Sequence, residues 1–425
     1  MRGPADAMRL LSLLAGSAVC LALLATDVAA MSYREALRAA TEYDASVSAL
    51  RKKVSRATTD IEAAKDAWLP SVSFAAETNT TSTGGPKALV TLSQVLFDWG
   101  LTRSKVSIAS YDRVKAVAKL KGAVEELAYE IALQFLTVET MDQKLACTEQ
   151  YATFARRIAK YSQDRVDAGL ADSAEIARAR LEISRAEDQL AQIQADRQMA
   201  LAQIEYLVGK QPDRVDPLPD LGFARLYSNS AAIISAVIVA PDYISAKADV
   251  RIAEKGIDKA KAARLPTISI QAQGKQALNG ERSQSGSIGL AASMDLDAGN
   301  FRGRAIKGAE QDLDAAKSSL LSTERDLQNK VRASVQQILV LQQTGVAQEK
   351  QLAQADQVLD AYEQQFVAGK RELVDLLTTG RDQYDAQVSS IDTFSTLKQT
   401  EYEAAQSIGV LGSLVVAAGG QHRVK

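Results

Sequence analysis

The stretch IEAAKDAWLPSVSF (residues 61–74) joins a segment that favours helix to a segment that favours strand. Its first half is rich in alanine and charged residues, which favour helix. After Leu69-Pro70, small polar and apolar residues alternate, as they do in strands. The stretch IDKAKAARLPTISI (residues 257–270) repeats this pattern. Proline disrupts helix interiors and biases the preceding residue to extended backbone. The sequence therefore predicts two helix-to-strand junctions, at Pro70 and Pro266.

The two junctions belong to an internal duplication, because further motifs recur in the same order at an offset of about 200 residues. The matching pairs are Leu96–Gly100 with Asp295–Gly299, Val166–Gly169 with Phe366–Gly369, and Leu207–Gly209 with Val410–Gly412. Each half is predicted to contain a helix, two strands, a very long helix, a glycine turn and a final helix. The predicted divisions are a first structural repeat at 31–210, a linker or equatorial region at 211–240, a second repeat at 241–414 and a tail at 415–425.

The distribution of proline permits very long helices. There is no proline between Leu101 and Gln211, and none after Pro266. Within the first of these regions, apolar residues step by three and four, the spacing of a coiled-coil seam. They are Val124, Leu127, Ile131, Phe135, Val138, Met141 and Leu145. A helix over residues 101–165 would be about 100 Å long. The sequence therefore predicts a fold that is mainly α, with long coiled-coil helices and a small β part.

The predicted strands form two hairpins, at about residues 70–98 and 266–297. Alternation of this length suits a tilted strand that crosses a bilayer, although a soluble hairpin with one buried face has the same periodicity. Export of the protein and the absence of any other predicted sheet favour the membrane. Four strands per chain cannot close a barrel, and open strand edges are not tolerated in lipid. Membrane insertion would therefore require several copies of the chain.

The N-terminus has the three regions of a secretory signal peptide, predicted at residues 1–30. Arginines precede an apolar run, and small residues follow, with cleavage expected after Ala30. An uncleaved membrane anchor is the alternative, but the apolar run is short for a membrane span. The residues before Cys20 make a poor lipidation signal. Cleavage leaves Cys147 as the only cysteine, so no intrachain disulfide is expected, and no later segment is apolar enough for a transmembrane helix.

Composition and motifs argue against several classes of function. A net charge of −2 and a pI near 5.8 give no reason to expect a nucleic-acid partner. The lone His422 supports neither a histidine-based triad nor a histidine metal cluster. DLDAGN (295–300) resembles the start of a calcium loop, but Gly299 occupies a ligand position and Ile306 replaces the bidentate glutamate. No GxxxxGK phosphate loop is present. We therefore predict no enzyme, no cofactor and no metal site.

From SYREALRAATEYD at residue 32 to the C-terminal IGVLGSL, the mature chain resembles the TolC-type outer-membrane efflux proteins. The residues that carry the resemblance are the duplication, the LP before a strand in each half, LSQVLFDWG (92–100) and YEQQFVAGKRELVDLLTTGRDQYDAQ (362–387). The resemblance implies a homotrimer with a shared twelve-stranded antiparallel transmembrane β-barrel, four strands per chain. It also implies a helical tunnel through the periplasm of a Gram-negative bacterium, which meets a periplasmic adaptor and an inner-membrane transporter, either ABC or proton-driven.

The function that the resemblance implies is a passive exit duct in the outer membrane. Its substrates would be drugs and other small molecules, or protein or polysaccharide in a type I-like secretion system. The alternative is a periplasmic coiled-coil scaffold or adaptor without a channel. At the membrane boundary, Trp68 is placed where interfacial tryptophans lie, and its counterpart in the second half, Arg264, would be level with lipid headgroups.

The resemblance places a pore constriction at the periplasmic tip. Asp375, six residues after Gly369, matches an acidic residue that forms a ring in the family's tunnel. Thr378 stands where some members have a second aspartate, which argues for one acidic ring from this helix. In the first half, Glu175 stands six residues after Gly169, where the family has a carboxylate. The alternative is that these are solvated charges in the first turns of helices, where carboxylates are favoured.

A gate latch and a docking surface are implied at the same tip. Arg371 matches a basic residue that latches the closed tip, and Phe366 stands where a tyrosine partner is found. We hypothesise that Glu175 pairs with Arg371. The turns AGLADS and AGKREL expose Gly169, Leu170 and Gly369, which the family suggests as an adaptor-docking surface. Capping of helix ends by these glycines is compatible with that role.

Overall fold

The computed structural model describes residues 30–77, 86–278, 284–294 and 303–421, with side chains as far as residue 417. Three sequence predictions concern residues outside these ranges. They are the signal peptide, of which only Ala30 is described, the rejected calcium loop at 295–300, and His422.

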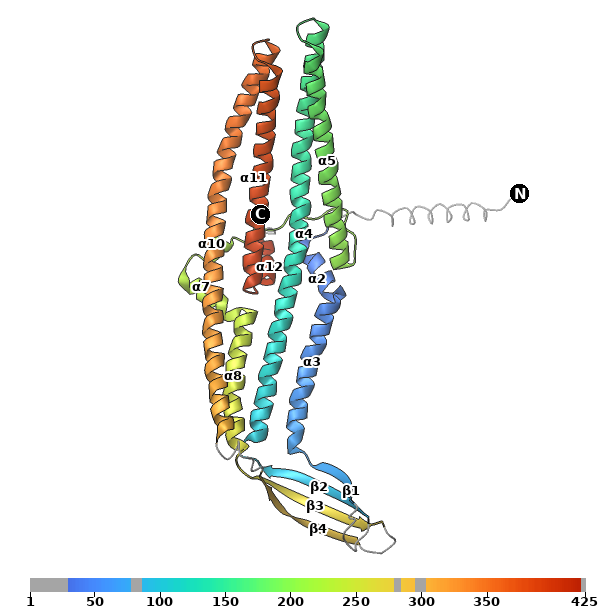
Figure 1. Cartoon of the computed structure of the whole chain (residues 1–425), viewed down its shortest axis with the longest axis vertical. Helices are drawn as coiled ribbons and strands as arrows, with labels where there is room; N and C mark the ends of the chain where they lie inside the picture. Colours follow the sequence, from blue (N-terminus) through green and yellow to red (C-terminus); the bar gives the residue numbers. More distant parts are fainter. Residues whose placement is uncertain (1–29, 78–85, 279–283, 295–302, 422–425) are drawn as a thin grey trace, which may run out of the picture. The chain divides into compact units, whose positions relative to one another are not determined.

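The described chain consists mainly of helices, with four strands (Figure 1). Its first half contains α2 (Tyr33–Tyr43), α3 (Ala45–Lys65), the short 3-10 helix η1 (Asp66–Trp68), β1 (Ser71–Glu77), β2 (Lys87–Phe97), α4 (Leu101–Asp167) and α5 (Ser173–Val208). Its second half contains α6 (Phe223–Leu226), α7 (Ser230–Val239), α8 (Pro241–Ala262), β3 (Thr267–Ala277), β4 (Gln284–Ser293), α10 (Arg304–Val367), α11 (Leu373–Ser407) and α12 (Leu411–Gln421). The predicted fold class, mainly α with a small β part, is confirmed.

Both helix-to-strand junctions lie at the predicted prolines. In the first half, η1 ends two residues before Pro70 and β1 begins directly after it. In the second half, α8 ends at Ala262 and β3 begins directly after Pro266. The helix predicted over residues 101–165 is α4, which has 67 residues. The proline-free stretch after Pro266 contains a second helix of similar length, α10, with 64 residues.

The contacts between residues divide the chain into two compact units. The first contains the described residues up to Ala39 together with Ile131–Leu218, and the second contains Ala40–Glu130 and the described residues from Pro219 onward. In the first unit, the ring of Tyr33 packs edge-on against Phe135. In the second unit, α10 packs against α8 and α11. The two repeats seen in the sequence do not coincide with these units, and that division of the chain stays a prediction.

The segment 211–240, predicted as a linker, contains helices α6 and α7. The side chain of Tyr402 in α11 holds this segment shortly before α6, because its hydroxyl donates a hydrogen bond to the Pro219 carbonyl (2.8 Å). Among the described residues, no single helix is apolar and long enough to cross a membrane. The bent pair of α7 and α8, which meet at 65°, satisfies the length and composition criteria only when the two are taken together.

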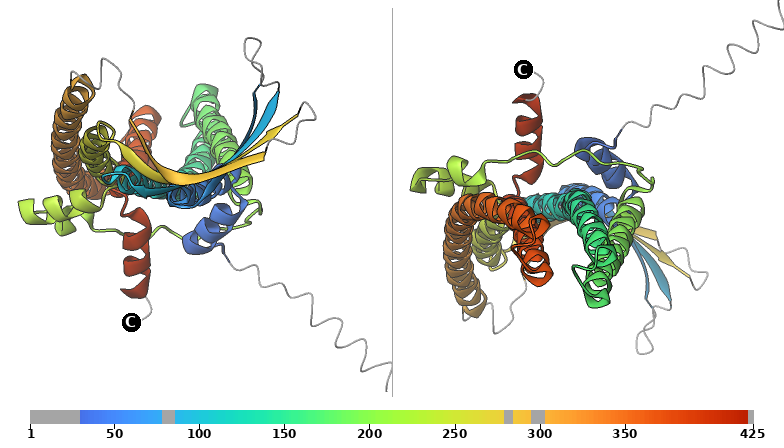
Figure 2. Two further views of the ribbon diagram at one scale, coloured as in Figure 1. Left: turned by 90° about the horizontal axis from the view of Figure 1, so that it is seen from below. Right: turned by 90° about the horizontal axis from the view of Figure 1, so that it is seen from above.

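The four strands form one antiparallel sheet in the second unit, in the order β1-β2-β3-β4. The pairing of β2 with β3 joins the hairpin of the first half to that of the second. Figure 2 shows that the sheet is bowed rather than flat. Strands β1 and β4 each have one neighbouring strand, so the sheet of a single chain has two open edges.

The register of the sheet separates apolar from polar side chains. Row by row, one face carries Val72, Phe74, Val90, Leu92, Ile270, Ala272, Ile288 and Leu290. The opposite face carries mainly Ser71, Ser73, Thr91, Ser93, Gln271, Gln273, Lys275 and Ser287. The apolar face is uncovered in the single chain, since Phe74 and Ile288 are each 79% exposed. A strand that is apolar outside and polar inside is typical of a transmembrane barrel around a water-filled lumen.

Two buried carboxylates hold the short helices of the second unit. Glu125 in α4 accepts hydrogen bonds from the first backbone N–H groups of α12, including that of Gly412 (3.3 Å). Glu401 in α11 accepts from the backbone at the start of α6, including Phe223. Carboxylates at helix N-termini are favourable because they complete hydrogen bonds that the helix leaves unmade. Burial nevertheless raises the pKa of both Glu125 and Glu401 above the usual glutamate value.

The stability of the protein should consequently fall as the pH rises above the ordinary pKa of glutamate. Between that value and the raised pKa of the folded state, the folded protein binds more protons than the unfolded chain, so raising the pH favours unfolding. Urea midpoints of the detergent-solubilised protein over a pH series measure this dependence. Glu125→Gln and Glu401→Gln should each flatten it, whereas Glu62→Gln, at an exposed carboxylate of α3, should not. Midpoints that are equally pH-dependent in all four proteins would contradict the assignment.

Candidate functional site

The first unit contains one of the two predicted tip turns, between α4 and α5. Gly169 has a left-handed backbone (φ 67°), and the N–H of Leu170 donates to the carbonyl of Arg165 (2.8 Å). Asp172 then caps α5 by accepting from the N–H groups of Ala174 and Glu175 (2.7 and 3.2 Å). These bonds satisfy the ends of both helices, as expected for a glycine C-cap and an aspartate N-cap. The capping role predicted for Gly169 is therefore confirmed.

Glu175 and Leu170 have different surroundings in this turn. The Glu175 carboxylate lies 3.6 Å from the Arg165 guanidinium, and both side chains are about one-quarter exposed. One carboxylate oxygen of Glu175, Oε2, is buried and accepts no hydrogen bond from the described residues. Leu170 is 71% exposed. The turn thus presents an apolar side chain to solvent and a half-buried carboxylate with unused acceptor capacity.

The second unit contains the matching turn, between α10 and α11. Gly369 is left-handed (φ 70°), and the N–H of Lys370 donates to the carbonyl of Gln365 (2.8 Å). Since the bonds at Gly169 follow the same pattern, the two halves of the chain build the same turn from similar sequences. Phe366, expected in the latch, is completely buried directly before the turn.

Arg371 has both an acidic and an aromatic partner near this turn. Its guanidinium pairs with the Asp375 carboxylate (3.2 Å) and lies 3.8 Å from the centre of the Tyr362 ring. A guanidinium stacked on an aromatic face gains a cation–π interaction. The Nε atom of Arg371 is buried and donates no hydrogen bond to the described residues. Asp375 is about half exposed, so its charge reaches the solvent.

Tyr362 is the residue of this site that the sequence interpretation missed. It stands four residues before Phe366, the position on which the resemblance focused. It stands nine positions before Arg371, a spacing that does not place two side chains together on one helix. Only the turn at Gly369, which folds α11 back along α10, brings the arginine over its ring.

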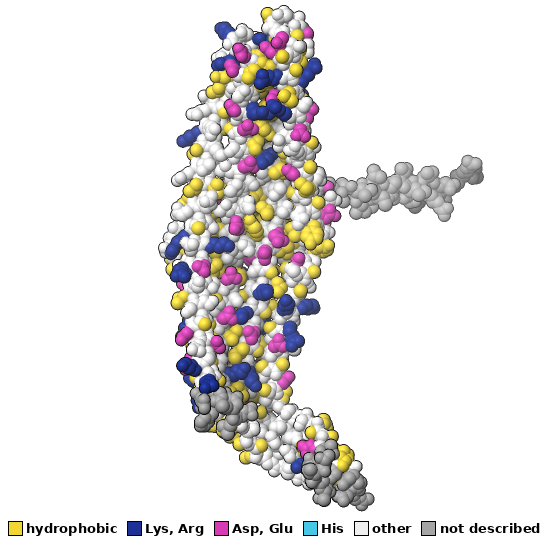
Figure 3. All heavy atoms as spheres, viewed as in Figure 1, with side chains coloured by type: hydrophobic (Ala, Val, Ile, Leu, Met, Phe, Trp, Pro, Cys, Tyr) yellow, Lys and Arg dark blue, Asp and Glu magenta, His cyan; other side chains and the backbone are white. Residues whose placement is uncertain are grey.

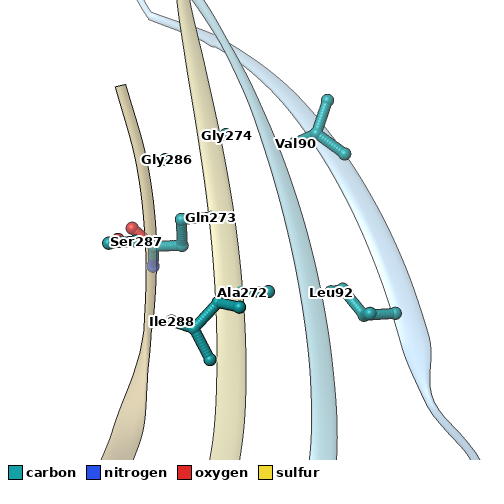
Figure 4. Close-up of a pocket in the computed structure, with 8 residues that line it drawn as sticks. All are labelled: Val90, Leu92, Ala272, Gln273, Gly274, Gly286, Ser287 and Ile288. Atoms are coloured by element: carbon teal, nitrogen blue, oxygen red, sulfur yellow. The ribbon is translucent and has the colours of Figure 1, made fainter. Parts of the chain in front are cut away.

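The apolar face of the sheet has a shallow hollow of about 430 Å³ (Figure 4). Gly274 and Gly286 pair across β3 and β4 and supply no side chain, which leaves space beside Val90 and Ile288. No ionisable side chain lines the hollow. Its surface suits an acyl chain or an apolar side chain and offers no groups for acid–base chemistry.

Reactive groups are scarce elsewhere in the part of the chain that the structure describes. No group of three or more His, Cys, Asp or Glu residues there could hold a metal ion. Cys147 is buried, and burial raises the pKa of its thiol to about 11. The thiol is therefore protonated at neutral pH and is a poor nucleophile.

Comparison with known proteins decides what this architecture is. The model of the family described as outer membrane efflux protein matches residues 36–210 and 234–410. The chain belongs to the outer membrane efflux protein family. The family model thus matches two separate segments of the chain, one after the other. As a member of this family, the chain lies in the outer membrane with a large periplasmic part and acts as an exit duct.

Individual relatives agree with the family assignment. The outer membrane efflux protein BepC of Brucella suis is 22% identical over 346 residues, which are 79% of this chain and 74% of BepC. The outer membrane protein VceC of Vibrio cholerae has a similar fold, with a TM-score of 0.75 and 16% identity over 89% of this chain and 96% of VceC. The open-state MtrE outer membrane channel of Neisseria gonorrhoeae gives 0.69, with 15% identity over 89% of each chain.

Proposed function

We propose that three copies of this chain close one channel, to which each copy contributes its four strands. The observation that carries the proposal is the sheet itself, which has an uncovered apolar face, a polar opposite face and two open edges. In lipid, the unpaired backbone groups of β1 and β4 must bond to other strands. Three copies give a closed twelve-stranded barrel with the apolar face toward lipid and the polar face toward water.

The periplasmic helices then form the tunnel of the duct, and their tip turns form its entrance. In this assignment Asp375 and Glu175 line the constriction, and Arg371 latches the closed tip beside the buried Phe366. The pairing of Glu175 with Arg371, residues of different units, stays a prediction. The exposed turns at Gly169, Leu170 and Gly369 dock a periplasmic adaptor, since a bare backbone at a helix cap permits close approach. The adaptor links the duct to an inner-membrane transporter, which supplies the energy.

The substrates proposed for the duct are drugs and other small molecules, or proteins or polysaccharides in type I-like secretion. The family assignment and the scarcity of reactive groups in the described residues favour passive conduction. A wide tunnel discriminates little between solutes, so selection is assigned to the inner-membrane transporter.

The trimer is tested by fractionation and electrophysiology. We expect detergent-resistant trimers in outer-membrane fractions and discrete conductance steps when the purified protein is added to a planar bilayer. Each step should correspond to one assembled barrel, because a single chain leaves two open strand edges in lipid. Recovery of a soluble periplasmic monomer without conductance would overturn the proposal in favour of a coiled-coil scaffold.

A further inference from the structure

We propose that the junction between α4, α8 and the sheet binds the phosphate of an anionic phospholipid headgroup in the periplasmic leaflet. This inference rests on the proposed placement of the sheet in the outer membrane. The site is a pocket of about 510 Å³ within the second unit, between the passage from β2 into α4 and the passage from α8 into β3. Its walls include Trp99, Arg103, Ser107, Lys255, Lys261 and Leu265.

Two of the cations that line the pocket form no ion pair within the described residues. Of the ionisable residues that line it, Lys255 and Asp258 neutralise each other through an ion pair of 2.9 Å. Arg103 and Lys261 are exposed, and neither side chain has an ion-pair partner among the residues that the structure describes. The two remaining cations therefore face the same space.

Helix electrostatics explains only one of these two cations. Lys261 lies in the last turn of α8, where the helix dipole favours positive charge. Arg103 lies in the first turn of α4, where the dipole disfavours it. Asp98 already completes that helix end by accepting from the N–H groups of Gly100 and Thr102 (3.0 and 2.7 Å). Arg103 thus has no part in completing this helix end, and its charge is available to an anion from outside the chain.

Further basic residues lie close in sequence to the lining residues, or at the start of α10, which packs against α8. They are Lys105 in α4, Lys259 in α8, Arg264 after α8, and Arg304 and Lys307 in α10. Figure 3 shows Lys and Arg side chains gathered where the helices meet the sheet. Basic residues next to a membrane-spanning segment attract anionic lipids. The sequence interpretation placed only Arg264 at this level.

Trp99 connects the pocket to the lipid-facing side of the sheet. Phe97 pairs with Ile268, which lies on the apolar face together with Ile270 and Ala272. The ring of Trp99 packs edge-on against Phe97, with centroids 4.8 Å apart. The aromatic pair therefore continues the apolar face up to the basic pocket. A phospholipid has the same order of parts, an acyl region followed by a phosphate.

The backbone of Trp99 is strained, which shows that its position is strongly determined. Its φ of 57° is left-handed, and among the described residues it is the only non-glycine residue with a positive φ. Its indole N–H donates a hydrogen bond to the Pro266 carbonyl (3.0 Å), which satisfies its polar atom at the start of β3. A tryptophan with an apolar ring in lipid and a satisfied N–H is typical of the membrane interface.

The chemistry of the pocket distinguishes a lipid from a free anion. Phosphate alone would use Arg103 and Lys261 but would leave Trp99 and Leu265, both more than 40% exposed, without a partner. A glycerophospholipid places its phosphate between the two cations and its acyl chains along the aromatic side. The headgroup must carry a net negative charge. Phosphatidylglycerol meets this requirement, and zwitterionic phosphatidylcholine does not.

Quenching of tryptophan fluorescence tests this site directly. The chain has two tryptophans, Trp68 and Trp99, so Trp68→Phe leaves Trp99 as the only tryptophan reporter. The full-length variant is reconstituted in phosphatidylcholine vesicles with increasing fractions of phosphatidylglycerol brominated on its acyl chains, or of phosphatidylcholine brominated in the same way. Two basic residues beside the lipid favour its anionic form. Half-maximal quenching should therefore need a fraction of brominated phosphatidylglycerol that is on the order of tenfold lower than the fraction of brominated phosphatidylcholine.

Charge-removing variants then locate the preference. In the Trp68→Phe background, Arg103→Gln with Lys261→Gln should make the two quenching curves coincide. The matched control, Arg325→Gln with Lys330→Gln, removes the same charges from exposed positions of α10. These positions lie about 30 Å or more from the start of that helix, and the control should leave the preference unchanged.

Each outcome has a distinct meaning. Equal quenching by both lipids before any charge is removed overturns the headgroup site but leaves the sheet in the bilayer. No quenching by either lipid overturns both the site and the proposed membrane placement. Loss of the phosphatidylglycerol preference in millimolar inorganic phosphate assigns the pocket to a free anion and overturns the lipid. Loss of the preference in the α10 control as well shows that net charge, and not this pocket, attracts the lipid, and likewise overturns the site.

Discussion

Replacing Gly409 with alanine should destabilise the protein by about 2–5 kcal/mol, the sum of left-handed strain and overpacking. Gly409 lies between α11 and α12 with a φ of 68°. A Cβ atom there would clash with Cδ of Pro241 and lie 2.9 Å from its Cγ. The proline ring cannot move aside as a flexible side chain does, because it forms the first residue of α8. The substitution therefore forces α12 to move away from α8, or forces residue 409 out of its left-handed conformation.

Gly169→Ala is the matched control for this substitution. Gly169 has nearly the same backbone angle (φ 67°), but a Cβ atom there would meet nothing within 4 Å. It should cost only the conformational strain, about 1 kcal/mol. The difference between the two variants isolates the contact with Pro241. Urea midpoints and the survival of trimers in detergent measure it. If the two variants lose equal stability, the approach of Gly409 to Pro241 is not tight in the protein.

The features that sequence predicted well are those fixed by a few neighbouring residues. The junctions at Pro70 and Pro266 follow from proline chemistry, and the caps at Gly169 and Gly369 follow from the left-handed geometry that glycine permits. The two long proline-free stretches became α4 and α10, and the first of them also has the predicted coiled-coil spacing. Each signal lies within one or two turns of the residues that it determines.

The features that sequence missed depend on residues far apart in the chain. The stacking of Arg371 on Tyr362 exists only because α11 folds back on α10. The hydrogen bond from Trp99 to Pro266 joins residues of the two halves, and the approach of Gly409 to Pro241 joins α8 to the end of α11. Without knowledge of the pairing of the halves, no local pattern distinguishes these residues from their neighbours. The resemblance named family positions such as Phe366, but a family position does not reveal that its side chain is fully buried.

Replacing Arg371 with alanine should raise the single-channel conductance severalfold in a planar bilayer. The guanidinium has two partners near the turn, the carboxylate of Asp375 and the face of the Tyr362 ring. Its Nε remains buried without a hydrogen bond to the described residues, so the side chain retains a donor for a partner in the closed assembly. If this arginine latches the entrance, its removal frees the turn to move outward and leaves the Asp375 carboxylate in the conducting path.

Lys370→Ala is the control for this prediction, since it removes the same charge from the adjacent, exposed position of the same turn. It should leave the conductance close to that of the unmodified protein. Arg371→Lys should give an intermediate conductance, because lysine keeps the charge but not the planar group that stacks on Tyr362 and bonds to Asp375. Glu175→Ala should match Arg371→Ala if the two residues form the latch. Equal conductance of the Arg371→Ala and Lys370→Ala channels would show that Arg371 is only a surface charge. A rise in Arg371→Ala alone, without one in Glu175→Ala, would keep Arg371 in the gate and assign its closing partner to another residue.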